Sequence, residues 1–253
     1  MKHSILNMTA RWPALLAGCA MALLLGSSAL ALDEAGITQA LERADRSDTD
    51  RALDASRQPA VVLSYLGVEE GMTVLDLMAS AGWYTEVLSH AVGPQGKVLM
   101  HNAPGSLARG NTAAAIDARL DNRLTNVERV EGEFSDISVA PGSVDLALTH
   151  LNFHDVYNSN PANAQTLLAF AKDALKSGGI LGIVDHRGNP GADNAALHRI
   201  TLDEVAQAVT EAGFYIVGVS DALHVESDTR EVGPFDESLG RNTDRILVKA
   251  MKP

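Results

Sequence analysis

The 253-residue sequence has little cysteine and little basic charge. Its single cysteine, Cys19, leaves no partner for an internal disulfide, and if the amino-terminal segment is removed no thiol remains for catalysis or metal binding. Lys and Arg number 20 against 32 Asp and Glu, a formal net charge of −12. An acidic chain is a poor match for nucleic-acid phosphates and for anionic lipid. We therefore expect neither nucleic acid nor a membrane surface as a partner.

The sequence also lacks an apolar run long enough for a comfortable transmembrane helix, which needs about 20 residues. Lys2 and Arg11 precede the apolar stretch 12–26, and Ala29-Leu30-Ala31 follows it. A basic start, a short apolar centre and a small-x-small end are typical of a secretory signal peptide. We expect residues 1–31 to be removed and the protein to be periplasmic or secreted. An uncleaved anchor helix and a lipoprotein acylated at Cys19 are the alternatives.

Beyond the signal segment, no repeat or low-complexity tract is present, and 46% hydrophobic with 21% charged residues is ordinary globular composition. Residues 32–58 are polar, with Ile37, Leu41 and Ala44 at helical spacing, so we predict a helical lead-in. Its acidic residues, such as Asp50, are expected to lie on a solvated surface. Residues 59–253 are predicted to form one domain.

Strand and helix patterns alternate through this domain. Strands are expected at 73–77, 97–100, 127–130, 144–149, 180–184, 215–219 and 244–250. Helices are expected at 59–66, 83–92, 112–120, 161–175 and 201–212, with Asn160 and Thr201 as caps. The alternation predicts an α/β fold with a doubly wound, mostly parallel seven-stranded sheet. No helix separates the last two strands, so the final one should run antiparallel at or near an edge.

The turn after the first strand reads Asp76-Leu77-Met78-Ala79-Ser80-Ala81-Gly82-Trp83-Tyr84-Thr85-Glu86. It resembles the class I S-adenosylmethionine-dependent methyltransferases, whose first strand ends in an acidic residue and a glycine-rich loop. Asp76 matches the acidic position and Gly82 the last glycine. Met78 and Ser80 stand where the family usually has glycine, which lets backbone approach a ligand closely. The Gly82–Glu86 run and Asp185-His186-Arg187 resemble an exported bacterial group of methyltransferases.

This resemblance covers roughly residues 50–252, and Leu175-Lys176-Ser177-Gly178-Gly179 is similar to the family's turn before the fifth strand. It implies a Rossmann-like fold and S-adenosylmethionine as cofactor. Asn102 stands at the ribose position, and Glu133, with Asp136 as second choice, at the adenine position. The cofactor residues that the resemblance implies are Asp76, Met78, Ser80, Gly82, Tyr84, Thr85, Asn102, Glu133, Phe134 and Thr149.

Polar clusters follow the fourth and fifth predicted strands, whose carboxyl ends should meet at one rim, where this architecture binds ligands. The candidate catalytic residues there are His154, Asp155, Asp185, His186 and Arg187. Histidine suits proton abstraction and arginine suits an anionic substrate group. We expect His154 and His186 to face one pocket together with Asp155, Asp185 and Arg187. The competing interpretation is that these side chains only hold loops.

Several rim residues, His198 included, are acceptable metal ligands, but no compact motif such as His-Glu-x-x-His is present, so we predict no metal. The leading function is S-adenosylmethionine-dependent methyl transfer to an unidentified small molecule. The alternatives are a non-catalytic exported binding protein of the same fold and, behind it, a metal-assisted hydrolase. Fold alone does not choose between them.

Overall fold

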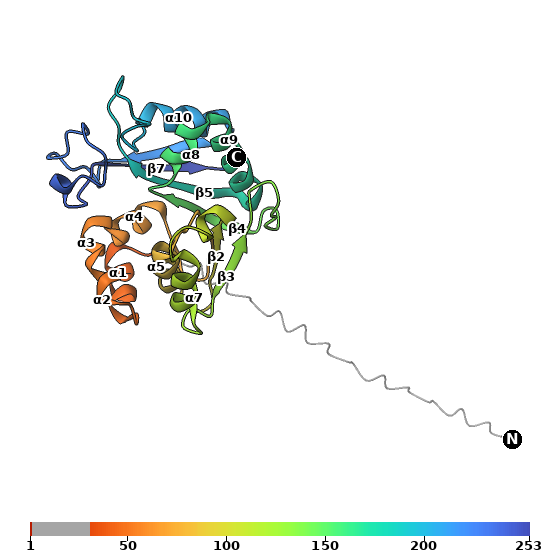
Figure 1. The fold of residues 1–253 in the computed structure, drawn as a ribbon. Helices are drawn as coiled ribbons and strands as arrows, with labels where there is room; N and C mark the ends of the chain where they lie inside the picture. The colour runs from red at the N-terminus through yellow and green to blue at the C-terminus, as the bar shows by residue number, and fades with distance from the viewer. Residues whose placement is uncertain (2–30) are drawn as a thin grey trace.

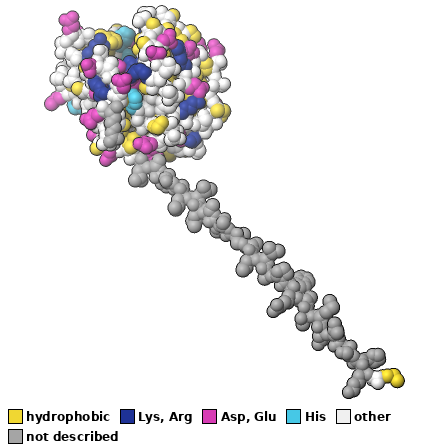
Figure 2. All heavy atoms as spheres, turned by 90° about the horizontal axis from the view of Figure 1, so that it is seen from below, with side chains coloured by type: hydrophobic (Ala, Val, Ile, Leu, Met, Phe, Trp, Pro, Cys, Tyr) yellow, Lys and Arg dark blue, Asp and Glu magenta, His cyan; other side chains and the backbone are white. Residues whose placement is uncertain are grey.

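The computed structural model describes Met1 and residues 31–253. The predicted signal peptide, apart from its two end residues, and the alternative lipid-attachment residue Cys19 lie outside the described residues. None of the helices in the described part is long and apolar enough to cross a bilayer. Over the face shown in Figure 2, acidic and basic side chains are interspersed rather than gathered into one basic patch.

One seven-stranded sheet organises the described chain, in the order β3-β2-β1-β4-β5-β7-β6 (Figure 1). Its strands are β1 (Thr73–Leu77), β2 (Lys97–Asn102), β3 (Val127–Glu131), β4 (Val144–His150), β5 (Leu175–His186), β6 (Tyr215–Ser220) and β7 (Arg245–Met251). Strands β1 to β5 pair in parallel, and β7 is antiparallel to both β5 and β6. The predicted doubly wound sheet is confirmed, and the antiparallel last strand lies next to the edge.

Helices cover both faces of the sheet. They are α1 (Glu34–Arg43), α2 (Asp48–Ala52), α3 (Asp54–Arg57), α4 (Pro59–Leu66), α5 (Trp83–Val92), α6 (Pro104–Leu107), α7 (Thr112–Leu120), α8 (Phe153–Ser159), α9 (Pro161–Ala174) and α10 (Leu202–Glu211). One apolar core lies under α8, α9 and α10, and a second joins the sheet to α1, α4 and α5. Figure 1 shows these two groups of helices on opposite sides of the sheet.

The helix before β5 ends earlier than its sequence period predicts. Leu175 keeps the apolar spacing of α9, yet it begins β5 and pairs with Val144 across a register irregularity. Its side chain is fully buried at the start of β5, and an apolar residue also suits the end of a helix, so apolar spacing alone could not show where the helix stops. The predicted strand 180–184 is therefore only the central part of β5.

The lead-in segment is part of the same folded unit. Ile37 and Leu41 of α1 are 0% and 5% exposed and pack into the core shared with α4 and α5. The Trp83 indole N–H of α5 donates to the Asp50 carbonyl of α2 at 3.0 Å. This packing fixes α2 and α3 beside the carboxyl ends of the central strands.

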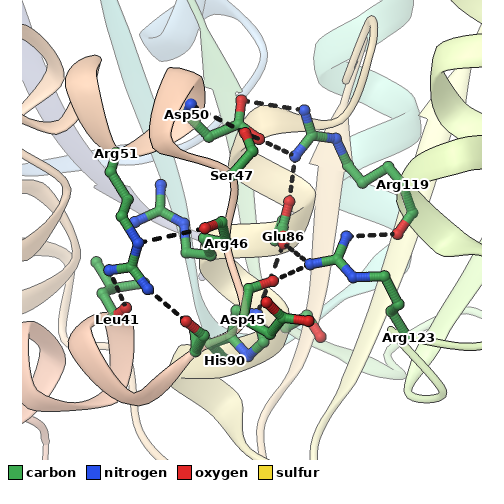
Figure 3. Close-up of polar contacts among 12 residues, drawn as sticks. Leu41, Asp45, Arg46, Ser47, Asp50, Arg51, Glu86, His90, Arg119 and Arg123 are labelled. Carbon is green, nitrogen blue, oxygen red and sulfur yellow. Dashed lines mark hydrogen bonds and ion pairs between the residues drawn. The ribbon is translucent and has the colours of Figure 1, made fainter.

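An ion-pair network adds to this attachment (Figure 3). Glu86 of α5 has a side chain only 1% exposed and pairs with Arg119 and Arg123, the second at 2.7 Å. Arg119 also pairs with Asp50 of α2 at 2.8 Å. Burial would raise the pKa of Glu86, but the nearby His90, the hydrogen bond from Arg123 and the charge of Arg119 lower it to about 2. Asp50 is thus an ion-pair partner rather than part of a solvated surface.

Candidate functional site

A cavity of about 620 Å³ opens at the carboxyl ends of β1, β4 and β5. Its inner wall is the turn after β1 together with the ends of β4 and β5. Its outer wall comes from α3 and from residues 234–245, the segment that leads into β7. Figure 1 shows α3 (orange) and the segment between β6 and β7 (blue) on the same side of the molecule. Ligands of doubly wound sheets bind at this position.

The turn after β1 has a left-handed backbone at three alternate positions. Met78, Ser80 and Gly82 have φ of 57°, 52° and 80°. A non-glycine residue in this conformation costs roughly 1–2 kcal/mol. At Gly82 an added Cβ would also lie 2.8 Å from the Met100 Cε. At Met78 and Ser80 the turn therefore keeps a backbone conformation that glycine favours, although a side chain makes that conformation unfavourable.

The ends of β2 and β3 hold this turn in place. The Asn102 amide accepts from the Ser80 N–H at 2.8 Å and donates to the Ser80 carbonyl at 3.0 Å. His101 Nδ1 accepts from the Met78 N–H at 3.2 Å, and its Nε2 faces the Gly132 carbonyl at 3.1 Å. Asn102 is 1% exposed, and its amide secures the turn. His101 is a supporting residue that sequence reasoning missed.

Asp76 is the buried carboxyl group of the cavity. It is 2% exposed, lines the cavity and accepts a hydrogen bond from the Thr85 hydroxyl at 2.6 Å. Burial raises the pKa of Asp76 to about 7, although the hydrogen bond from Thr85 opposes the shift. Thr85 is fully buried and serves the site through Asp76.

The structure divides the predicted cofactor residues into two groups. Asp76, Met78, Ser80 and Tyr84 line the cavity, whereas Gly82, Thr85, Asn102, Glu133, Phe134 and Thr149 do not. Glu133 and Asp136 are exposed on the segment after β3. Phe134 stacks on His101, with ring centroids 4.3 Å apart. The predicted adenine residues therefore lie outside the cavity that Asp76 lines.

The predicted catalytic residues converge in part. Asp185 is fully buried, and its carboxylate accepts the His154 backbone N–H at 2.7 Å while lying 2.6 Å from His154 Nδ1. His154 Nε2 lies 3.2 Å from the Asp155 carboxylate. Burial lowers the pKa of His154, but hydrogen bonds to Asp155 and Asp185 outweigh that effect and raise it to about 9. Asp185 is a positioning residue behind the cavity wall.

His186 lines the same cavity as His154, with the two ring centroids 5.7 Å apart. Its Nδ1 lies 2.8 Å from the Thr243 hydroxyl. Burial and the charge of Arg245 hold the pKa of His186 well below its usual value, so this ring is neutral at pH 7. Of the two histidines, His186 is the one that is neutral at pH 7, and the same burial and charge that keep it neutral also make it a weak base.

The prediction that Arg187 faces this pocket is wrong. Its guanidinium donates to Asp221 at 3.2 Å and does not line the cavity. The direction of the chain explains the difference, because Arg187 follows the last residue of β5 and pairs through its backbone N–H with the Asp244 carbonyl. Its side chain therefore lies on the neighbouring loop.

Two arginines that sequence reasoning missed, Arg57 and Arg245, line the cavity where Arg187 was expected. Arg245 is 3% exposed and donates to the Thr243 hydroxyl at 3.0 Å, the Arg241 carbonyl at 3.1 Å and the Ser56 carbonyl. Arg57 is half-buried and stacks over the Trp83 ring at 4.4 Å. Within residues 31–253 neither guanidinium has a carboxylate at ion-pair distance. Burial lowers the pKa of both.

Two neutral polar atoms complete the cavity floor. The Tyr84 hydroxyl and His150 Nε2 are buried and have no hydrogen-bond partner among the described residues. Burial raises the pKa of Tyr84, and burial together with Arg57 lowers that of His150 well below its usual value. A buried polar group without a partner costs about 1–3 kcal/mol. A polar ligand in the cavity would supply the missing hydrogen bonds.

Solved structures share this fold. An S-adenosylmethionine-dependent methyltransferase from Aquifex aeolicus is 24% identical, with 88% of this chain and 100% of that one covered and a TM-score of 0.60. A Burkholderia thailandensis methyltransferase with bound 1,6-didemethyltoxoflavin and S-adenosylhomocysteine is 20% identical over 81% of each chain, with a TM-score of 0.55. The cyclase SpnF is 16% identical over 79% of this chain and 81% of its own, with a TM-score of 0.58.

At these identities the likeness shows the fold alone, and SpnF shows that the fold is not confined to one reaction. No protein-family profile matches the sequence, and no curated protein matches it.

Proposed function

We propose that the protein is an exported S-adenosylmethionine-dependent methyltransferase that acts on a small anionic molecule. The observation that carries the proposal is the turn after β1. Met78 and Ser80 are held at positive φ beside a cavity into which the buried Asp76 faces. Backbone strain of this kind persists where the surrounding structure enforces it, and such places cluster at functional sites.

The residues around Asp76 fit the aminoacyl end of the cofactor. A buried carboxylate can accept hydrogen bonds from an ammonium group, and the Tyr84 hydroxyl is a buried polar atom without a partner in the described chain. When bound, the cofactor supplies an electrophilic methyl group on a sulfonium. Glu133 and Phe134, on the segment after β3, are the residues that we propose for the adenine end.

The substrate side of the cavity is cationic. Arg57 and Arg245 present charge that no carboxylate of the described chain neutralises at short range, so a carboxylate or phosphate on the substrate suits them. His186 is neutral, and it can take a proton from the substrate's nucleophile once an anionic substrate group offsets the charge of Arg245 that lowers its pKa. The remaining contribution of the chain is to hold the acceptor in position.

A non-catalytic binding protein is the second candidate, and Asn102 favours it. Both the oxygen and the nitrogen of its amide are bonded to Ser80, which leaves the side chain with less hydrogen-bonding capacity for a ribose diol. Met78 adds a side chain at the cavity wall. A chain of this kind would keep the anionic site without transferring a methyl group.

Calorimetric titration of residues 32–253 with S-adenosylmethionine and S-adenosylhomocysteine separates the two candidates. We expect binding that Asp76→Asn weakens and Met78→Gly strengthens, since glycine removes both the side chain and the cost of positive φ. Asp117→Asn, exposed and outside the cavity, is the matched control. Absence of heat with both the wild type and Met78→Gly at millimolar ligand would contradict the methyltransferase proposal and favour the binding protein.

The same titration has an expected pH dependence. Because the pKa of Asp76 is raised to about 7, only its ionised form, which accumulates above that pH, can pair with the cofactor's ammonium group. Affinity should therefore increase from pH 6 to pH 8 in the wild type and stay flat in Asp76→Asn. A wild-type affinity that is independent of pH would remove Asp76 from the binding site.

A further inference from the structure

Three side chains meet at one point on the cavity rim. One Asp155 carboxylate oxygen lies 3.2 Å from His154 Nε2 and 2.8 Å from His198 Nδ1. One ligand atom from each residue can be chosen so that all lie within 4.8 Å of one another. His154 and Asp155 begin α8, whereas His198 comes from the turn after β5, where it has a φ of 50°.

Both ring nitrogens of His154 face carboxylate oxygens, an arrangement that a cation would stabilise. Its Nδ1 faces the Asp185 carboxylate at 2.6 Å while its Nε2 faces Asp155. A neutral imidazole carries a single N–H, so one of these nitrogens then presents a lone pair to a carboxylate oxygen. Either a second proton or a metal ion relieves that opposition. His198 places a second ring nitrogen beside the same Asp155 oxygen. A second proton on His154 would relieve the opposition without this additional nitrogen.

The support behind His154 is that of a metal ligand. Metal-binding histidines donate their other ring N–H to a carboxylate, which fixes the tautomer and the ring orientation. Asp185 does this for His154, and it is itself fixed because its carboxylate also accepts the His154 and His186 backbone N–H groups at 2.7 and 2.8 Å. The His154 side chain is 4% exposed, so the ring has little freedom to turn away.

We propose that His154, Asp155 and His198 bind a divalent metal ion of the zinc class at the rim of the cavity. Two imidazoles and one carboxylate suit zinc and similar transition metals rather than magnesium or calcium, which prefer oxygen ligands alone. The side chains of Asp155 and His198 are 55% and 51% exposed, which leaves room for a water or a substrate oxygen as a further ligand. Asp155 also lines the cavity.

This proposal departs from the sequence prediction of no metal. That prediction rested on the absence of a compact ligand motif, and the proposed ligands form no such motif because Asp155 and His198 are 43 positions apart in the sequence. The inference does not depend on S-adenosylmethionine. A metal ion here could hold the anionic group of a substrate in either of the two candidate functions.

The test is metal titration of residues 32–253 after treatment with a chelator and its removal. Cobalt(II) gives visible absorption bands whose intensity reports tetrahedral or five-coordinate geometry, and zinc binding can be followed by calorimetry. We expect one ion per chain. Asp155→Asn and His198→Ala should each lower the affinity by at least about 10-fold, because each removes one of three protein ligands.

Both variants change exposed side chains, so unchanged melting temperatures without metal will show that they fold. His224→Ala is the matched control, because His224 is also exposed and lies 3.0 Å from a carboxylate, that of Asp244. The control should bind cobalt like the wild type. The proposal fails if the wild type binds neither ion, or if His198→Ala and Asp155→Asn bind both ions with unchanged affinity.

Discussion

Arg57 has an unusual charge environment for a half-buried residue. Its guanidinium contacts Trp83 but has no ion-pair partner in the described chain, so Arg57→Gln should change stability by no more than about 1 kcal/mol. We expect inorganic phosphate to raise the melting temperature of the wild type at constant ionic strength, and this increase to vanish in the variant. Arg187→Gln, whose partner Asp221 lies outside the cavity, should respond like the wild type. An unchanged phosphate response in Arg57→Gln would contradict the anionic-substrate proposal.

At the scale of single residues, sequence reasoning identified reactive side chains at the cavity better than it identified the partners that those side chains contact. Asp76, His154 and His186 do lie at the cavity, because the residues that end parallel strands share one rim. Arg245 carried a usable signal, since it begins a mostly apolar strand that was expected to run antiparallel and therefore to start at that same rim. Arg57 carried no such signal in the sequence, because only the packing of the lead-in segment brings it to the cavity.

At the scale of elements, Glu86 is a buried carboxylate that joins α5 to α7 (Figure 3). Its pKa is lowered to about 2 from an ordinary value of 4.5, so its stabilising effect is complete above about pH 4.5 and is lost as pH falls toward 2. Glu86→Gln should cost about 3–5 kcal/mol at pH 7, as expected when one partner of a buried ion pair is removed.

Denaturant unfolding of Glu86→Gln between pH 7 and pH 3 checks this, and the difference from wild type should shrink toward acid. Asp117→Asn is the control, because Asp117 also pairs with an arginine but its side chain is 67% exposed. Such a surface pair contributes about 1 kcal/mol or less. Equal effects of the two substitutions on the free energy of unfolding would show that the network in Figure 3 stabilises the fold no more than a surface ion pair does.

Local signals predicted the helix starts well. The Asn160 side chain caps α9, and Thr201 with Glu204 forms the predicted capping box of α10. These signals are short-range hydrogen bonds that the sequence encodes directly. The start of β5 at Leu175 was missed because an apolar residue fits both the end of a helix and the start of a buried strand.

At the scale of the whole molecule, we propose that the protein is exported and that residues 1–31 are removed, leaving Leu32 at the amino terminus. The basis is the uncharged run that ends in Ala29-Leu30-Ala31. Amino-terminal sequencing of protein isolated from the periplasmic fraction and the medium should give Leu32 as the first residue. A start at an acylated Cys19, or an intact Met1, would contradict this proposal.

More of the sheet than of the cavity could be predicted from the sequence. Strand patterns and the rules for parallel connections give the sheet and the rim at which ligands bind. The outer wall could not be predicted in this way, because α3 and residues 234–245 come from nearly opposite ends of the described chain. No local pattern relates two such segments, and their meeting depends on how the whole core packs.

This outer wall bears on the order of events when the protein is made. Residues 234–245 lead into β7, the last strand, and include its first residue, so the cavity has no complete wall until almost the entire chain has folded. A polypeptide that crosses a membrane unfolded therefore cannot carry a bound ligand with it from the cytoplasm. Whatever occupies this cavity in an exported protein must be captured from the compartment in which folding finishes, so the supply of small molecules there sets what the site can do.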